Sequence, residues 1–177
     1  IYDGEFKFGS REGQGTFISC SEGTKFDGQW KDEKKNGPGQ HFFSDKRVLQ
    51  GEWLDDKKPS VGTMSYPDGT KYEGQFNQIY QRHGAGAFCF ENGYKFEGNF
   101  VNDVQEYKGT LYYLDGSKYK GELQHGSPLV RHGLGIMYYK NLSTYDGDWV
   151  IDKRHGQGVM SYANGNRYDG GWKNHLR

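Results

Sequence analysis

Hydrophobic and polar residues alternate along this chain with a period of two. In residues 71–76 the two aromatic residues and the glycine share one parity, and the lysine, glutamate and glutamine share the other. Gly84, Gly86, Phe88 and Phe90 continue the alternation further along the chain. A period of two is that of a β-strand, whose successive side chains point to opposite faces of a sheet. The pattern predicts pairs of strands with aromatic residues and glycines on one face and charged residues on the other.

The alternating segment recurs throughout the chain. The motif Tyr72–Phe76 has counterparts at intervals of 23 to 26 residues, with central glycines Gly4, Gly28, Gly51, Gly74, Gly98, Gly121, Gly147 and Gly170. A Gly-x-Gly half-motif follows most of them. A fixed period of this length indicates a repeat architecture. We expect residues 1–177 to form a single array of repeats, at about 1–24, 25–46, 47–70, 71–94, 95–117, 118–142, 143–166 and a partial 167–177.

Turn signals separate the repeats. They are Asp68-Gly69, Asn92-Gly93, Asp115-Gly116 and Asn164-Gly165, and such pairs supply the positive φ angles that tight hairpin turns need. The connection inside a repeat varies in length, and we expect the extra residues of Gln124–Arg131 to project from one edge. Glycine weakens a strand interior, so its regular placement there needs a reason. We expect an aromatic ring to lie across each position that lacks a side chain.

Composition supports an all-β fold and excludes several functions. The 28 glycines, 14 tyrosines, 11 phenylalanines and 4 tryptophans make up almost a third of the 177 residues, whereas aliphatic residues are scarce. The 23 basic residues balance 23 acidic ones, so the chain lacks the basic footprint of a nucleic-acid-binding protein. No stretch approaches the roughly 20 apolar residues that a membrane-spanning helix needs.

Three segments of one repeat carry a resemblance to a known family. Residues 145–149 read Tyr-Asp-Gly-Asp-Trp, residues 153–158 contain His-Gly-Gln-Gly, and residues 161–166 contain Asn-Gly. This order resembles the MORN repeat, a unit of about 23 residues whose name stands for membrane occupation and recognition nexus. The departures from the pattern are Leu49, Ser60, Tyr107 and Leu123. The resemblance implies an elongated, single-layer, twisted antiparallel sheet of consecutive hairpins, curved into a trough.

The aromatic face is the main candidate for function. A single layer cannot bury such a face by itself, and a large exposed apolar surface marks an interface. We expect this face to be concave and to bind an extended or helical segment of another protein. The alternative is that the rings pack only on each other and on the glycines. A homodimer, through the same face or through the terminal strands, is a further option. The candidate partner-binding residues are Phe76, Phe88, Phe96, Phe100, Tyr112, Tyr119, Tyr138 and Trp149.

Basic residues in the loops inside the repeats support an alternative function. We expect them to lie on a common edge, next to acidic residues, and to bind anionic phospholipid headgroups in that case. The chain would then be a membrane-targeting module attached to an enzyme domain elsewhere in a longer protein. The candidate headgroup-binding residues are Lys34, Lys35, Lys57, Lys58, Lys153 and Arg154.

No pattern of catalytic residues is visible, and we expect a non-catalytic protein without cofactors or bound metal. His83, His132 and His155 recur before Gly-x-Gly, but equivalent positions lie two strands apart, about 10 Å, which is too far for a shared metal. Cys20 and Cys89 lie three repeats apart and cannot pair. The family resemblance implies a cytoplasmic location, associated with the cytoskeleton, cilia or membranes.

Overall fold

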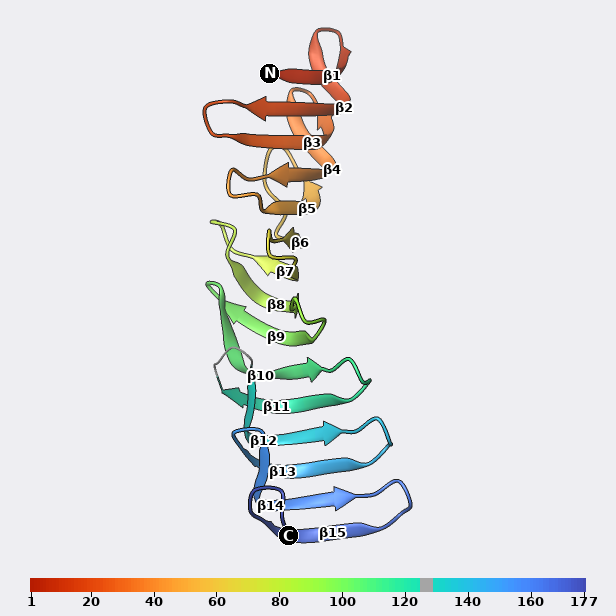
Figure 1. The fold of residues 1–177 in the computed structure, drawn as a ribbon. Coiled ribbons are helices and arrows are strands. Elements are labelled where there is room, and N and C mark those ends of the chain that lie inside the picture. The colour runs from red at the N-terminus through yellow and green to blue at the C-terminus, as the bar shows by residue number, and fades with distance from the viewer. Residues whose placement is uncertain (125–128) are drawn as a thin grey trace. The chain divides into compact units, whose positions relative to one another are not determined.

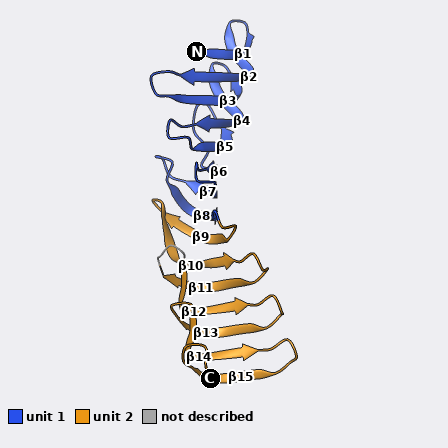
Figure 2. Cartoon of the chain, in the orientation of Figure 1, with its two compact units in different colours: residues 1–91 blue, residues 92–177 orange. Residues whose placement is uncertain are grey.

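The computed structural model describes residues 1–124 and 129–177, and these residues form strands and no helix (Figure 1). They divide into two compact units, unit 1 with residues 1–91 and unit 2 with residues 92–177 (Figure 2). Within the predicted loop Gln124–Arg131, residues 125–128 lie outside the described residues. The strands of unit 1 are β1 (Tyr2–Lys7), β2 (Ser10–Ser19), β3 (Thr24–Lys31), β4 (Lys34–Phe42), β5 (Val48–Trp53), β6 (Val61–Ser65), β7 (Lys71–Phe76) and β8 (Arg82–Cys89). The strands of unit 2 are β9 (Lys95–Val101), β10 (Val104–Tyr112), β11 (Lys118–Gln124), β12 (Val130–Tyr138), β13 (Thr144–Val150), β14 (Lys153–Ser161) and β15 (Arg167–Trp172).

Within each unit, every strand is antiparallel to the next one along the chain. The strand order is β1 to β8 in unit 1 and β9 to β15 in unit 2. Each predicted repeat from 1–24 to 143–166 supplies two consecutive strands. The all-β hairpin fold that the alternation predicted is therefore confirmed.

Two kinds of turn connect the strands. Between repeats, the predicted Asx-Gly pairs place glycine at φ values of +81° to +87°, at Gly69, Gly93, Gly116 and Gly165. The first of these turns is closed by Asp68, whose Oδ1 accepts a hydrogen bond from the Thr70 backbone N–H at 2.9 Å. Inside repeats, two-residue turns form without glycine, as at Ile151 (φ 47°) and Asp152 (φ 62°). Positive φ at both central residues is typical of the type I′ turn, whose twist matches the flanking strands.

The first glycine of a Gly-x-Gly half-motif occupies a bulge. In β14, Gly156 has a φ of +55°, and the register with β13 shifts next to Gly147. The Asp148 carboxylate occupies the space above Gly156 and accepts a hydrogen bond from the Gln157 backbone N–H at 2.7 Å. A Cβ at Gly156 would lie 2.2 Å from Asp148 Oδ2. The position therefore requires glycine both for its backbone angle and for room.

The core of each unit lies on one face of its sheet, which we call the aromatic face. In unit 2 the Trp149 ring lies edge-on to Tyr145 at 5.1 Å and to Tyr119 of the preceding repeat at 5.5 Å. Trp149 Nε1 also donates a hydrogen bond of 2.9 Å to the Gly135 carbonyl. A Cβ at Gly135 would lie 2.1 Å from the Tyr119 hydroxyl oxygen. The predicted placement of rings across the glycines is thus confirmed, and the rings interlock in the edge-to-face geometry that aromatic pairs prefer.

An arginine covers the outer side of these rings, in an arrangement that we call the arginine clasp. Arg131 lies 4.4 Å from the centre of the Trp149 ring, and its Nε is 2.8 Å from Asp152 Oδ1 in the next turn. In unit 1, Arg11 lies 4.3 Å from the centre of the Trp30 ring. The same arrangement recurs where Arg154 lies 4.3 Å from the centre of the Trp172 ring. In these three places the clasp joins one repeat to the next, and the tryptophans are at most 5% exposed.

Candidate partner-binding face

The structure buries most of the aromatic residues that the sequence assigns to a partner-binding groove. Those that are at most 7% exposed are Phe76, Phe96, Phe100, Tyr119 and Trp149. They form the core, which corrects the expectation that they line an open groove. Phe88 is half-buried beside them. Tyr112 and Tyr138 lie on the other face, because Leu111 and Met137 hold the inward-facing positions of β10 and β12. A partner-binding role for Phe88, Tyr112 and Tyr138 stays a prediction.

The opposite face of each sheet, which we call the open face, is hollowed. In unit 2 the hollow has a volume of about 380 Å³ and extends over β10 to β13. Gly109, Gly121 and Gly135, which pair with one another in register, contribute the backbone of its floor. Leu134 and Ile136 flank the last of these glycines, and Leu134 is 61% exposed. The expectation of a concave aromatic face is therefore corrected, because the hollow lies on the open face.

Charged residues line the unit 2 hollow on both sides of its apolar centre. Lys108 and Lys120 lie on β10 and β11, and neither forms an ion pair with any residue that the structure describes. Asp146 lies on β13 at the other end of the hollow. Glu122, which faces Lys108 in register, is turned over the backbone of Gly133. The hollow is thus basic on one side, apolar in the middle and acidic on the other side.

A row of lysines and tyrosines borders this hollow. Lys95 Nζ lies 5.0 Å from the ring centre of Tyr112, and Lys118 Nζ lies 5.1 Å from the ring centre of Tyr138. The Tyr112 hydroxyl donates a hydrogen bond of 2.7 Å to Glu97 Oε2, and this bond raises the pKa of Tyr112. The row presents amphipathic tyrosine rings beside the hollow, which suits contact with a partner.

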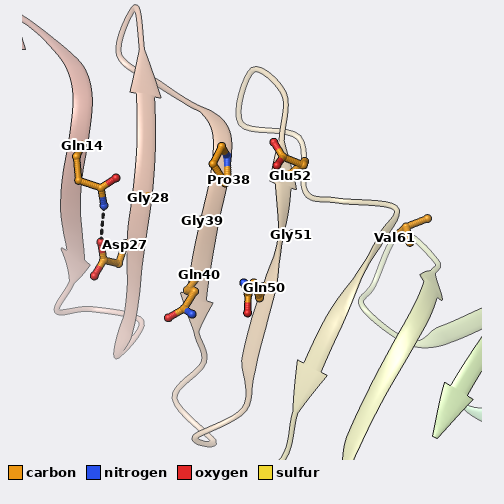
Figure 3. A pocket seen from close by; sticks show the side chains of 10 residues that line it. All are labelled: Gln14, Asp27, Gly28, Pro38, Gly39, Gln40, Gln50, Gly51, Glu52 and Val61. Atoms are coloured by element: carbon orange, nitrogen blue, oxygen red, sulfur yellow. Dashed lines mark hydrogen bonds between the residues drawn. The ribbon is translucent and has the colours of Figure 1, made fainter.

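The hollow of unit 1 has a different chemistry (Figure 3). It has a volume of about 480 Å³, and its walls are mostly carboxamide and carboxylate side chains. Gln14 Nε2 donates a hydrogen bond of 2.8 Å to Asp27 Oδ1, whereas Gln40 and Gln50 lie side by side in register. None of the described residues that line it is a lysine or an arginine. This hollow is weakly acidic, and the apolar side chains in its lining are Pro38 and Val61.

The repeat motifs identify the family. The sequence profile described as MORN repeat matches residues 2–24, 26–46, 50–71, 96–118, 130–144 and 145–167, well over half of the chain. The chain belongs to the MORN-repeat family. No curated protein matches the sequence closely enough to count as a relative.

Solved structures with the same fold are distant in sequence. One is the TCP10c domain of Drosophila melanogaster Sas-4, with a TM-score of 0.56 and 9% identity over 90% of this chain and 93% of that chain. Another is the SAS-4 (dCPAP) TCP domain of Drosophila melanogaster, in complex with a proline-rich motif of Ana2 (dSTIL). It has a TM-score of 0.56 and 10% identity over 88% of this chain and 82% of that chain. At such identities the likeness concerns the fold.

The basic residues proposed for headgroup binding lie beside the turns inside the MORN repeats. Lys34, Lys57 and Lys153 are exposed. The other three are Lys35, Lys58 and Arg154, whose cationic groups lie within 4.8 Å of the centres of the Phe26, Tyr80 and Trp172 rings. Burial lowers the pKa of both of these lysines. Half of the set is therefore engaged within the chain, and headgroup binding by the exposed half stays a prediction.

The remaining sequence candidates form no site in the described part of the MORN array. No group of three or more His, Cys, Asp or Glu side chains there could hold a metal ion. The Nδ1 atoms of His132 and His155 are enclosed and have no hydrogen-bond partner among the described residues. Cys20 and Cys89 are exposed free thiols. No described helix could cross a membrane.

Sequence reasoning missed Leu134 and Ile136 as candidates, although a signal was present. Both alternate with the inward-facing residues Gly133, Gly135 and Met137, so their parity places them on the charged face. Two large aliphatic residues at that parity indicate an exposed apolar patch.

Proposed function

We propose that this MORN-repeat chain is a non-catalytic scaffold that holds a segment of another protein on the open face of unit 2. The observation that carries the proposal is the hollow of about 380 Å³ around Leu134, a large aliphatic side chain that is 61% exposed. Exposed apolar surface beside polar residues is characteristic of interaction sites. A cytoskeletal or ciliary setting, which the family resemblance implies, is part of the proposal.

The distant structural neighbour supports this choice of function. Its TCP domain is described in complex with a proline-rich motif of Ana2, and its fold matches this chain. A sheet of this type can therefore hold a short segment of a partner protein. The proposal keeps the predicted protein partner and moves its site from the aromatic face to the open face.

Site-specific photo-crosslinking tests the proposal, because the chain offers two matched positions. Leu134 lies in the unit 2 hollow and is 61% exposed, and Ile151 lies in a turn of the same unit and is 63% exposed. A photoreactive phenylalanine analogue at each position would be irradiated in a cell extract, and the crosslinked peptides identified by mass spectrometry. We expect one partner segment to crosslink from position 134 and not from position 151. Leu134→Glu should abolish capture of that partner, and Ile151→Glu should leave it intact.

Other outcomes would contradict the proposal. Equal crosslinking from both positions, or capture that survives Leu134→Glu, would remove the open face as the site. Flotation of the chain with anionic liposomes, without any captured protein, would instead favour the lipid-directed alternative.

A further inference from the structure

We propose that the unit 2 hollow selects an extended segment in which an acidic, an apolar and a basic side chain follow one another within about four residues. This inference rests on the proposed function and names the chemistry of the partner segment.

The shape of the hollow favours an extended segment that runs across the strands. Its floor is the row of Gly109, Gly121 and Gly135, which pair in register on β10, β11 and β12. On each strand the residues before and after the glycine form the two banks. These banks are about 7 Å apart, because residues i and i+2 of a strand are separated by twice its rise. A helix is about 10 Å wide with its side chains and does not fit between them, whereas an extended backbone does.

The side chains on the two banks change from basic to apolar to acidic along the unit 2 hollow. Beside the glycines, β10 carries Lys108 and Thr110, and β11 carries Lys120 and Glu122. On β12 the corresponding residues are Leu134 and Ile136. On β13 both residues beside the glycine are aspartates, and Asp146 lines the hollow. An acidic side chain is favoured between the lysines, an apolar one between the aliphatic residues, and a basic one beside the aspartate.

The register sets the spacing of these positions. Lys120 pairs with Ile136, and Ile136 pairs with Asp146, so the three residues form a line across adjacent strands. Two strand spacings are about 10 Å, and an extended chain advances about 3.3 Å per residue. The acidic and basic side chains of the segment should therefore be about three residues apart, with the apolar one between them.

The charged side chains of the unit 2 hollow are available to a partner. Neither lysine side chain, nor that of Asp146, has an ion pair or hydrogen bond among the described residues. Glu122, which faces Lys108 in register, has its carboxylate over Gly133. The unit 1 hollow provides the contrast, since Gln40, Gln50 and its other described lining residues include no basic group. It has no means of selecting an acidic side chain by charge.

A displayed library of random 12-residue peptides, panned against the whole chain, tests the inference. We expect the enriched peptides to share an acidic, an apolar and a basic position in the proposed spacing. Their affinity, measured by fluorescence anisotropy with labelled synthetic copies, should fall about tenfold or more with Lys120→Glu and with Asp146→Lys. It should also fall with Leu134→Ser and stay unchanged with the matched Ile151→Ser. Peptides re-selected on the Lys120→Glu chain should carry a basic residue in place of the acidic one.

The outcomes separate this inference from the proposed function. Enriched peptides that lack the charge pattern but lose affinity with Leu134→Ser would overturn the inference and leave the open face as the binding site. Peptides that bind regardless of Leu134→Ser would contradict both. A library without any enriched peptide would overturn the inference, and the crosslinking experiment would then decide the proposed function separately.

Discussion

The aromatic face and the open face differ in the opposite way from what their composition indicates: the aromatic face is buried, and the charged open face is hollowed. The aromatic face holds the buried Tyr, Phe and Trp side chains, and those of Tyr72, Tyr119 and Tyr145 are fully buried. The open face carries the charged residues, yet it holds both hollows and the exposed Leu134. The difference teaches that a single layer can bury a ring within itself, by placing it over glycines and under an arginine. The face that is richest in aromatic residues is then structural, and the proposed binding surface lies on the other side.

The largest expected effect on stability is that of removing the buried Trp149 side chain. Trp149→Ala should lower the free energy of unfolding by about 3–5 kcal/mol, because it empties a buried site between two tyrosines and removes a hydrogen bond. Tyr138→Ala on the open face should cost less than about 1 kcal/mol, since that side chain is half-exposed. Urea denaturation followed by far-ultraviolet circular dichroism measures both. Equal losses would show that the two faces do not differ as described.

Substituting glycine by alanine should destabilise the chain where a ring covers the glycine and not where the space beside it is open. Gly135→Ala should destabilise the chain by about 1–3 kcal/mol, because the new methyl group would lie 2.1 Å from the Tyr119 hydroxyl. Gly171→Ala is the matched control, because the nearest atom to its methyl group would be Gln157 Nε2 at 4.0 Å. We expect the control to leave the melting temperature unchanged or slightly higher. Thermal unfolding of the two variants compares them, and a loss at Gly171 would contradict the packing argument.

The next largest effect on stability is expected from a substitution in the arginine clasp. Arg131→Lys keeps the positive charge but lacks the planar group that covers Trp149 and donates to Asp152. We expect a loss of about 1–2 kcal/mol in the free energy of unfolding. Hydrogen exchange should show faster opening at the Trp149 indole N–H, because the clasp covers that ring. A stability equal to that of the wild type would mean that the rings alone bury each other.

Stability should depend on pH through a histidine on the aromatic face of unit 1. Burial, with the nearby Lys35 charge, lowers the pKa of His41 to about 4 from its usual value of 6.5. Between these values the unfolded chain binds a proton that the folded chain excludes, so stability falls as the pH drops from about 7 to about 4. The imidazole is half-exposed, and we therefore expect on the order of 1 kcal/mol. Denaturation at pH 7.5 and 4.5 measures the change, which His41→Gln should reduce. A pH dependence that persists in full would assign it to other groups.

Much of this fold follows from the sequence, because each local signal agrees with the others. The alternation set the strands, the Asx-Gly pairs set the turns between repeats, and the regular glycines predicted rings lying across them. Exposure did not follow, because it depends on contacts between successive repeats. The position of Arg131 over Trp149 is one such contact, and it joins residues of different repeats. The sequence shows the parity of Leu134, but the hollow beside it is formed by residues of β10, β11 and β13, which lie in other parts of the chain.

Leu134 is the position where a substitution should have the smallest effect on stability and a large effect on binding. Leu134→Ser should change the free energy of unfolding by less than about 0.5 kcal/mol, because the side chain is already 61% exposed. The same substitution should lower the affinity for the partner segment, since Leu134 and Ile136 supply the apolar part of the unit 2 hollow. Denaturation and anisotropy on one preparation measure the two effects together, with Ile151→Ser as the control that should change neither. A stability loss of several kcal/mol at Leu134 would make it a core residue, and the open face would then lose its distinction from the aromatic face.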